Sequence, residues 1–301
     1  MLKTMNMAKL KFFKVTFSRL VYLLLLVGFL NPSLSYTSED SGNDNFFNLS
    51  GIPEDLFAIN TLHGWREVKN GIEVHYFGID IQLLEGWKTY WRKTGNTGFP
   101  MSITWEEKYN FQDAIIHWPN PTIVNMAGEE SIGYTDRVVF PLEIHPQVAE
   151  LPIKGVGTIY LGICKEVCIP VNEVIAFDLF PTREKNSPLL HSSLMSKPET
   201  YASSIHRDEI NCQIDYENEP TTITTRIDSS FLDLSESFLA IYESSVDPVF
   251  FFKPEKTTDV EENRIISSKY EILEGTNIKL DPSKILLTII TANKTYEIQG
   301  C

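Results

Sequence analysis

Short apolar or alternating segments, separated by Gly, Pro and Asn, fill the chain from His63 to Phe180. Alternation with a period of two places every second side chain on the same face of a strand, and Gly and Pro mark turns between strands. The pattern therefore predicts an antiparallel β-sandwich. Its expected strands are 72–83, 101–105, 114–118, 137–144, 157–163 and 173–180.

A second β-rich segment follows a connector with one short helix. Leu190, Leu194 and Met195 recur at helical spacing, Ser187 is placed to cap the helix, and Pro188 suits its first turn. The expected strands beyond it are 221–227, 238–242, 249–253, 278–280, 285–291 and 296–299. The predicted fold is all-β, with a first sandwich over 62–181, a connector over 182–211 and a second sandwich over 212–301.

The N-terminal 35 residues have the order of a secretory signal peptide. Five basic residues and no acid precede or flank the apolar run from Leu20 to Leu30, and small residues follow it up to Ser35. The run is about 11 residues, short of the roughly 20 that span a bilayer. We expect a cleaved signal over 1–35, with an uncleaved membrane anchor as the alternative. The polar, acidic stretch up to residue 61 is expected to be a flexible leader.

Charge and compartment narrow the classes of function. The net charge is -14, and loss of the signal's five basic residues takes it to -19. Binding to nucleic acid is therefore not expected, because phosphates require basic patches. An exported chain lies where disulfides persist, so its four cysteines are expected to pair.

Cys164 and Cys168 are the candidate catalytic residues. Apolar, partly β-branched residues on both sides and Pro170 after the pair oppose a helix and favour a hairpin closed by residues 165–167. Cysteines opposed across a ladder are close enough to bond. Such a short loop stabilises by only about 2 kcal/mol, against about 4.6 kcal/mol for the loop between Cys212 and Cys301. The first pair therefore suggests a redox switch, and the second a structural disulfide.

The residues alone leave three roles open for Cys164 and Cys168. A structural disulfide and a thiol-exchange site are equally favoured. Lys165 would lower the pKa of the neighbouring thiol, while Glu166 opposes it. Two thiols with no histidine within fifteen residues form a weak zinc signal, and Cu(I) binding stays open. No hydrolase motif is present, and we expect neither a cofactor nor a metal.

Four motifs occur in an order that is more specific than the cysteine pair. They resemble the N-terminal periplasmic domain of the DsbD family of disulfide reductases, and most closely its suppressor-of-copper-sensitivity (ScsB-like) branch. The resemblance covers roughly residues 62–180. The motifs are Gly86-Trp87-Lys88-Thr89-Tyr90-Trp91-Arg92-Lys93-Thr94-Gly95 with Gly98-Phe99-Pro100, Trp118-Pro119-Asn120-Pro121, Ser131-Ile132-Gly133-Tyr134-Thr135-Asp136-Arg137 with Val138-Val139-Phe140-Pro141-Leu142, and 164–170.

The resemblance implies an immunoglobulin-like domain whose Cys164 and Cys168 cycle between dithiol and disulfide. Such domains take electrons from a membrane-embedded thiol carrier and pass them to oxidised thioredoxin-like proteins of the periplasm. The second sandwich resembles that branch's additional immunoglobulin-like domain. The chain ends at Cys301 with no transmembrane domain, so the carrier is expected to be a separate protein. The predicted activity is protein-disulfide reduction, with a non-catalytic periplasmic binding module or a copper-handling protein as the alternatives.

The resemblance also places further residues near the site. The expected cap loop, 125–130, lacks the aromatic residue found in some members, so the pair is expected to be shielded by Met126 or to be less shielded. Three residues separate the cysteines where several members have five. The candidate lining residues are Tyr90, Trp91, Met126, Tyr134, Asp136, Lys165 and Glu166, with Trp87 and Trp118 as further aromatics. For each aromatic the competing interpretation is an ordinary core residue.

Overall fold

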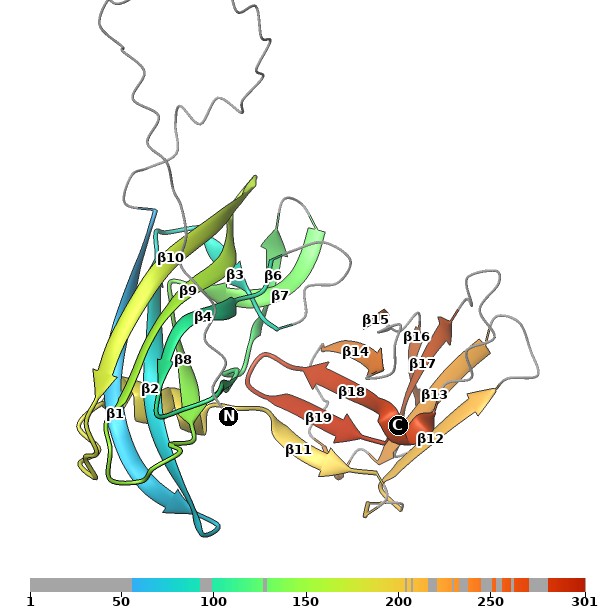
Figure 1. Cartoon of the computed structure of the whole chain (residues 1–301). Coiled ribbons are helices and arrows are strands. Elements are labelled where there is room, and N and C mark those ends of the chain that lie inside the picture. The colour runs from blue at the N-terminus through green and yellow to red at the C-terminus, as the bar shows by residue number, and fades with distance from the viewer. Residues whose placement is uncertain are drawn as a thin grey trace, which may run out of the picture. The chain divides into compact units, whose positions relative to one another are not determined.

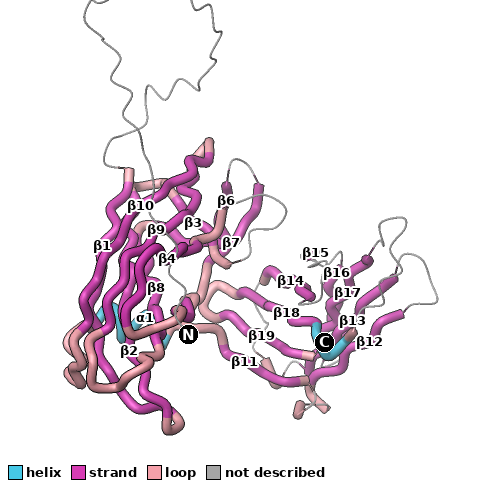
Figure 2. Tube along the Cα trace, in the orientation of Figure 1, coloured by secondary structure: helices cyan, strands magenta, loops and turns pink. Residues whose placement is uncertain are grey.

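The computed structural model describes residues 56–92, 99–126, 129–203, 205–206, 208–215, 221–228, 230–232, 238–244, 251–252, 256–260, 263–270 and 281–300. Strands and loops make up almost all of this part of the chain (Figure 2). The expected signal peptide, residues 1–35, lies outside it. The predicted all-β class is confirmed.

The first ten strands form two sheets (Figure 1). One sheet has the order β1-β2-β8-β5, and the other has the order β10-β9-β3-β7-β6, with β4 also paired to β9. The strands are β1 (Phe57–Lys69), β2 (Ile72–Leu83), β3 (Lys88–Tyr90), β4 (Ser102–Tyr109), β5 (Ala114–Ile116), β6 (Thr122–Met126), β7 (Glu129–Thr135), β8 (Arg137–Ile144), β9 (Ile153–Cys164) and β10 (Cys168–Leu179).

An apolar core lies between these two sheets. Phe77 of β2 and Phe140 of β8 face Ile159 and Ile163 of β9, and none of the four is exposed. The rings of Phe77 and Phe177 pack against each other in this core, with their centroids 4.7 Å apart. Burial of large apolar side chains from both sheets is the main force that holds such a sandwich together.

A long, regular hairpin of the first sandwich joins β9 to β10. Its antiparallel register runs without interruption from Ile153 opposite Leu179 to Cys164 opposite Cys168. The backbone N–H of Lys165 donates to the carbonyl of Val167 at 3.1 Å and closes the turn. The hairpin predicted for the cysteine pair is therefore confirmed.

The connector contains α1 (Pro188–Met195), as predicted. Its Leu190 is fully buried against Trp65, Val74 and Tyr76 of the first sandwich. Ser187 stands at the N-cap and Pro188 at the first position, but the serine side chain makes no capping hydrogen bond, so that expected role is wrong. Within the described residues, no helix is long and apolar enough to cross a membrane.

The later strands form two more sheets around a second apolar cluster that includes Ile223, Tyr242 and Leu287. Their orders are β11-β19-β18-β14-β15 and β12-β13-β17-β16. The strands are β11 (Glu199–Ala202), β12 (Ile210–Asp215), β13 (Thr221–Asp228), β14 (Leu239–Ser244), β15 (Phe251–Phe252), β16 (Lys256–Val260), β17 (Asn263–Tyr270), β18 (Ile285–Ile290) and β19 (Thr295–Gln299); η1 (Pro282–Lys284) is a short 3-10 turn.

Two differences from the sequence prediction have clear physical reasons. Strand β1 begins at Phe57, inside the stretch expected to be a flexible leader, because residues 57–61 pair with 79–83 of β2. Strand β11 lies inside the expected connector, where no strand was predicted, and pairs with β19 in parallel. Neither pairing leaves a signal in the local sequence, since both depend on a distant partner strand. The expected strand 278–280 lies outside the described residues.

The contact between Arg66 and His75 should make the stability of the first sandwich sensitive to acid. His75 is buried, and its Nδ1 accepts a hydrogen bond from Arg66 Nε at 3.3 Å. Desolvation by burial, and then the charge of Arg66, lower the pKa of His75 from 6.5 to about 4. The unfolded chain binds this proton more tightly, so stability should fall by up to about 3 kcal/mol as the pH drops from about 6.5 to about 4.

Urea unfolding at pH 7 and pH 4.5 would measure this loss of stability. His75→Asn keeps an acceptor for Arg66 and removes the titrating group, so the variant should lose less stability over the same pH range. Equal losses in the two proteins would show that His75 is not responsible.

Candidate functional site

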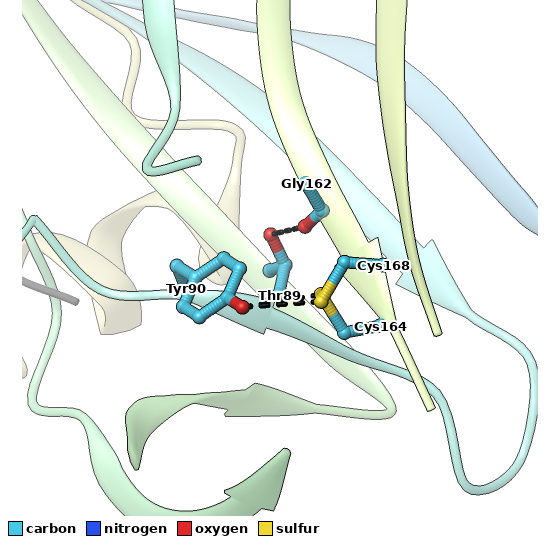
Figure 3. Close-up of a disulfide and its surroundings, with 5 residues drawn as sticks. All are labelled: Thr89, Tyr90, Gly162, Cys164 and Cys168. Atoms are coloured by element: carbon cyan, nitrogen blue, oxygen red, sulfur yellow. Dashed lines mark hydrogen bonds between the residues drawn. A yellow bond between two sulfur atoms is a disulfide. The ribbon is translucent and has the colours of Figure 1, made fainter. Parts of the chain in front are cut away.

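The two cysteines at the tip of the β9–β10 hairpin form a disulfide (Figure 3). Their Cα atoms lie 4.1 Å apart, as directly opposed residues of an antiparallel ladder. The two sulfur atoms have different surroundings, because Cys164 is 0% exposed while Cys168 is exposed to solvent. Cys168 is therefore the more accessible of the two cysteines to a thiolate from outside.

Cys164 is buried although it lies on the outward face of its strand. Side chains alternate along β9, with Lys154 and Tyr160 exposed and Ile159 and Ile163 in the core. That period of two places Cys164 on the same face as Tyr160. Tyr90 of β3 and Val124 of β6 cover it, and the three residues form a small apolar cluster of their own.

Tyr90 touches both sulfur atoms. Its hydroxyl lies 3.2 Å from Cys168 Sγ and 3.4 Å from Cys164 Sγ. Figure 3 shows the hydroxyl pointing at the disulfide. The ring is 4% exposed, and burial raises the pKa of the Tyr90 phenol. The predicted placement of Tyr90 beside the pair is thus what the structure shows.

Thr89 and Gly162 hold the Tyr90 strand against the hairpin. Thr89 is fully buried, and its Oγ1 donates to the carbonyl of Gly162 at 2.9 Å (Figure 3). A Cβ on Gly162 would lie 3.1 Å from Phe99 Cβ and 3.2 Å from a ring carbon of Tyr90. The close approach of Tyr90 therefore requires a residue without a side chain at position 162. Sequence reasoning missed Thr89, Val124 and Gly162 as members of the site.

Two charged candidates lie on the hairpin turn. Lys165 and Glu166 are both exposed next to the disulfide. The Lys165 side chain lies near Gly86, where a Cβ would be 3.2 Å from its Nζ. The ammonium group is therefore held close to the loop before β3, beside the cysteine pair.

Two other candidates have structural roles. Tyr134 is buried, its hydroxyl donates to the carbonyl of Pro119 at 2.9 Å, and burial raises the pKa of its phenol well above the usual value. Asp136 has a φ of +58° in the turn from β7 to β8, and its carbonyl accepts from the N–H of Leu83 at 2.7 Å. Neither has a hydrogen bond to a sulfur atom among the contacts described here.

The remaining aromatic candidates belong to the core. Trp91 is 0% exposed, with the Arg92 guanidinium 4.3 Å from its ring centroid. Trp87 is buried in the same core cluster, and Trp118 packs edge-on against Phe140. The competing interpretation, that these are ordinary core residues, describes them better than a role at the disulfide.

Met126 and Cys301 lie at the edges of the described residues or beyond them. Met126 ends β6 opposite Glu129, so the expected cap loop is the tip of the β6–β7 hairpin. The Met126 side chain and residues 127–128 lie outside what the structure describes. Cys301 does too, so its bond to Cys212, which is half-buried on β12, stays a prediction. The described residues contain no group of three or more His, Cys, Asp or Glu placed to hold a metal ion.

One surface hollow of the described residues is remote from the disulfide. It has a volume of about 630 Å³ and is lined by residues that include Tyr109, Lys154 and Asp178. Lys154 and Asp178 pair at the opposite end of the β9–β10 ladder from the cysteines. The disulfide therefore lies at the tip of the hairpin, away from this hollow.

A family model described as "Thiol:disulfide interchange protein DsbD, N-terminal" matches residues 69–178, which include both cysteines of the hairpin. The predicted resemblance to the DsbD N-terminal domain is confirmed. The matched segment includes β2 to β9 and nearly all of β10. The DsbD N-terminal domain is an immunoglobulin-like β-sandwich, in agreement with the pair of sheets around the first core.

A solved structure supports the fold of the DsbD-like segment and extends beyond it. It is the crystal structure of the N-terminal periplasmic domain of ScsB from Proteus mirabilis, with a TM-score of 0.56 and 21% identity. The match covers 81% of this chain and 92% of that one. A search of curated proteins finds no match.

Thr89→Val tests how the DsbD-like site is assembled. Valine has nearly the shape of threonine but cannot donate to the Gly162 carbonyl, so the variant should lose about 1–3 kcal/mol of unfolding free energy. Urea denaturation would measure the loss, with Thr104→Val on the exposed face of β4 as the matched control. Equal stabilities of the two variants would contradict the proposed role of the Thr89 hydrogen bond.

Proposed function

We propose that this chain is an exported thiol–disulfide exchange protein. It relays electrons from a membrane-embedded thiol carrier, a separate protein, to oxidised thioredoxin-like proteins of the periplasm. The observation that carries the proposal is the unequal burial of one disulfide, with Cys168 exposed and Cys164 covered. The DsbD N-terminal match over the same residues supports it.

The unequal burial of the two cysteines supports attack at Cys168. A thiolate of the reduced carrier attacks Cys168 Sγ, the Cys164–Cys168 bond breaks, and Cys164 leaves as a thiolate. A second thiolate of the carrier then displaces Cys168 from the mixed disulfide. The carrier dithiol is oxidised and the hairpin pair is reduced. Transfer to a thioredoxin-like acceptor is the same exchange with the hairpin pair as the donor.

Stability is a weak reason for this disulfide. Its four-residue separation closes a loop whose ends the β9–β10 ladder already holds together. The unfolded-state entropy that it removes is small, at about 2 kcal/mol. The bond between Cys212 and Cys301, proposed as structural, would close a much longer loop. The two pairs should therefore differ in how readily they are reduced.

Redox equilibrium in a glutathione series tests the proposal. Alkylation of the equilibrated protein should show Cys164 and Cys168 reduced at a potential well above about -300 mV, the upper bound that is typical of structural disulfides. Cys212 and Cys301 should stay protected under the same conditions and serve as the internal control. If the first pair resists reduction throughout, the chain is better explained as a binding module braced by two disulfides.

Single-cysteine variants test which sulfur meets the partner. Cys164→Ser keeps the exposed thiol, and Cys168→Ser keeps the covered one. Each would be mixed with a thioredoxin-like protein whose single thiol carries a thionitrobenzoate group, so that exchange releases a coloured product. Cys164→Ser should react at least about 10-fold faster, because thiol access limits exchange. Faster reaction of Cys168→Ser would reverse the assignment.

A further inference from the structure

The Tyr90 hydroxyl is the one described side-chain group with hydrogen-bond contacts to both reacting atoms. It lies 3.2 Å from Cys168 Sγ and 3.4 Å from Cys164 Sγ. In the disulfide neither sulfur carries a hydrogen, so the phenol O–H is the donor in both contacts. A single proton can point to only one sulfur at a time, and a sulfur that gains negative charge attracts it more strongly.

The position of this hydroxyl is fixed from two sides. The ring packs against the Gly162 backbone, with Val124 and Cys164 in the same apolar cluster. The neighbouring Thr89 ties β3 to β9 through the Gly162 carbonyl. Little reorganisation is then needed when charge develops on a sulfur, which is the condition under which a buried donor is most effective.

The phenol keeps its proton during exchange. Burial raises its pKa above the usual value of 10, and no cation is among the causes of the shift. At neutral pH Tyr90 is therefore a hydrogen-bond donor throughout. It is not a source of transferred protons.

We propose that Tyr90 is a catalytic residue of the exchange, one that stabilises the Cys164 thiolate as the leaving group and so directs attack to Cys168. The inference rests on the proposed function. As the partner thiolate bonds to Cys168 Sγ, the electron pair of the broken bond passes to Cys164 Sγ, 3.4 Å from the phenol. The thiolate accepts the Tyr90 O–H and later takes a proton from solvent.

The same hydroxyl serves the second step. When the partner's other thiolate displaces Cys168, the new thiolate forms 3.2 Å from Tyr90. The donor then moves from one sulfur to the other without movement of the ring. Both thiol protons of the reduced pair come from the partner's two thiols by way of solvent, so Tyr90 ends the cycle unchanged.

Tyr90→Phe tests the proposal with dithiothreitol as the reductant. The variant keeps the ring against Gly162 and removes only the donor, so reduction of Cys164–Cys168 should slow roughly 10- to 100-fold. Tyr76→Phe is the matched control, since Tyr76 is also buried in the first sandwich and its hydroxyl is 3.4 Å from Glu143. It should react at the wild-type rate. A wild-type rate for folded Tyr90→Phe would overturn the proposal.

A pKa measurement separates stabilisation of the thiolate from a merely structural effect. In a Cys168→Ser variant, thiolate absorbance at 240 nm reports the titration of the Cys164 thiol. The two cysteines of the second pair are expected to stay oxidised and so do not contribute to the signal. Adding Tyr90→Phe should raise the pKa of the Cys164 thiol by about 1 or more. An unchanged pKa would contradict the proposed hydrogen bond.

A third variant covers the case in which Tyr90→Phe does not fold. Tyr90→3-fluorotyrosine, introduced at this position alone, keeps the ring and hydroxyl and makes the O–H a stronger donor. Reduction by dithiothreitol should be faster than in the wild type, and an equal or slower rate would count against the proposal. The rate tests use a small dithiol, so they measure the effect of Tyr90 on reduction without any protein partner. If the wild-type pair proves inert toward thioredoxin-like proteins, that result overturns only the proposed relay.

Discussion

The β9–β10 ladder is the constraint on which the site depends. Its uninterrupted register sets Cys164 opposite Cys168 at one end and Ile153 opposite Leu179 at the other. Because side chains alternate between faces, a slip of one residue would move every core side chain of the hairpin to the outside. The apolar core thus fixes the pairing of the cysteines from a distance, without any contact to the sulfur atoms.

The ladder alone would leave the two sulfurs alike, both on the outward face near the hairpin tip. The difference between them comes from β3 and β6, which bring Tyr90 and Val124 over Cys164, although the Tyr90 hydroxyl also contacts Cys168 Sγ. One sulfur is then open to attack and the other is placed to leave, with a donor beside it. Burial therefore makes the two sulfur atoms of the disulfide unequal, and this difference is the basis of the proposed relay.

The closeness of Tyr90 depends on the small residue at position 162 and on the hydrogen bond from Thr89. Each of these features serves packing and chemistry together. Removal of the Thr89 donor would leave a buried carbonyl without that partner, and a side chain at position 162 would push Tyr90 or Phe99 away. The contacts that position Tyr90 therefore also stabilise the first sandwich. The remote hollow at the other end of the hairpin takes no part in it.

The β class, the hairpin and the family resemblance could be predicted from the sequence, because alternation, Pro170 and the ordered motifs are local signals. It placed Tyr90 correctly but could not separate it from Trp91 or Tyr134, whose side chains the fold sends into the core and to Pro119. It gave no sign of Thr89 or Val124, and it took residues 57–61 and β11 for irregular segments. These points required the folded structure, since burial and strand pairing arise between residues that are far apart in the chain.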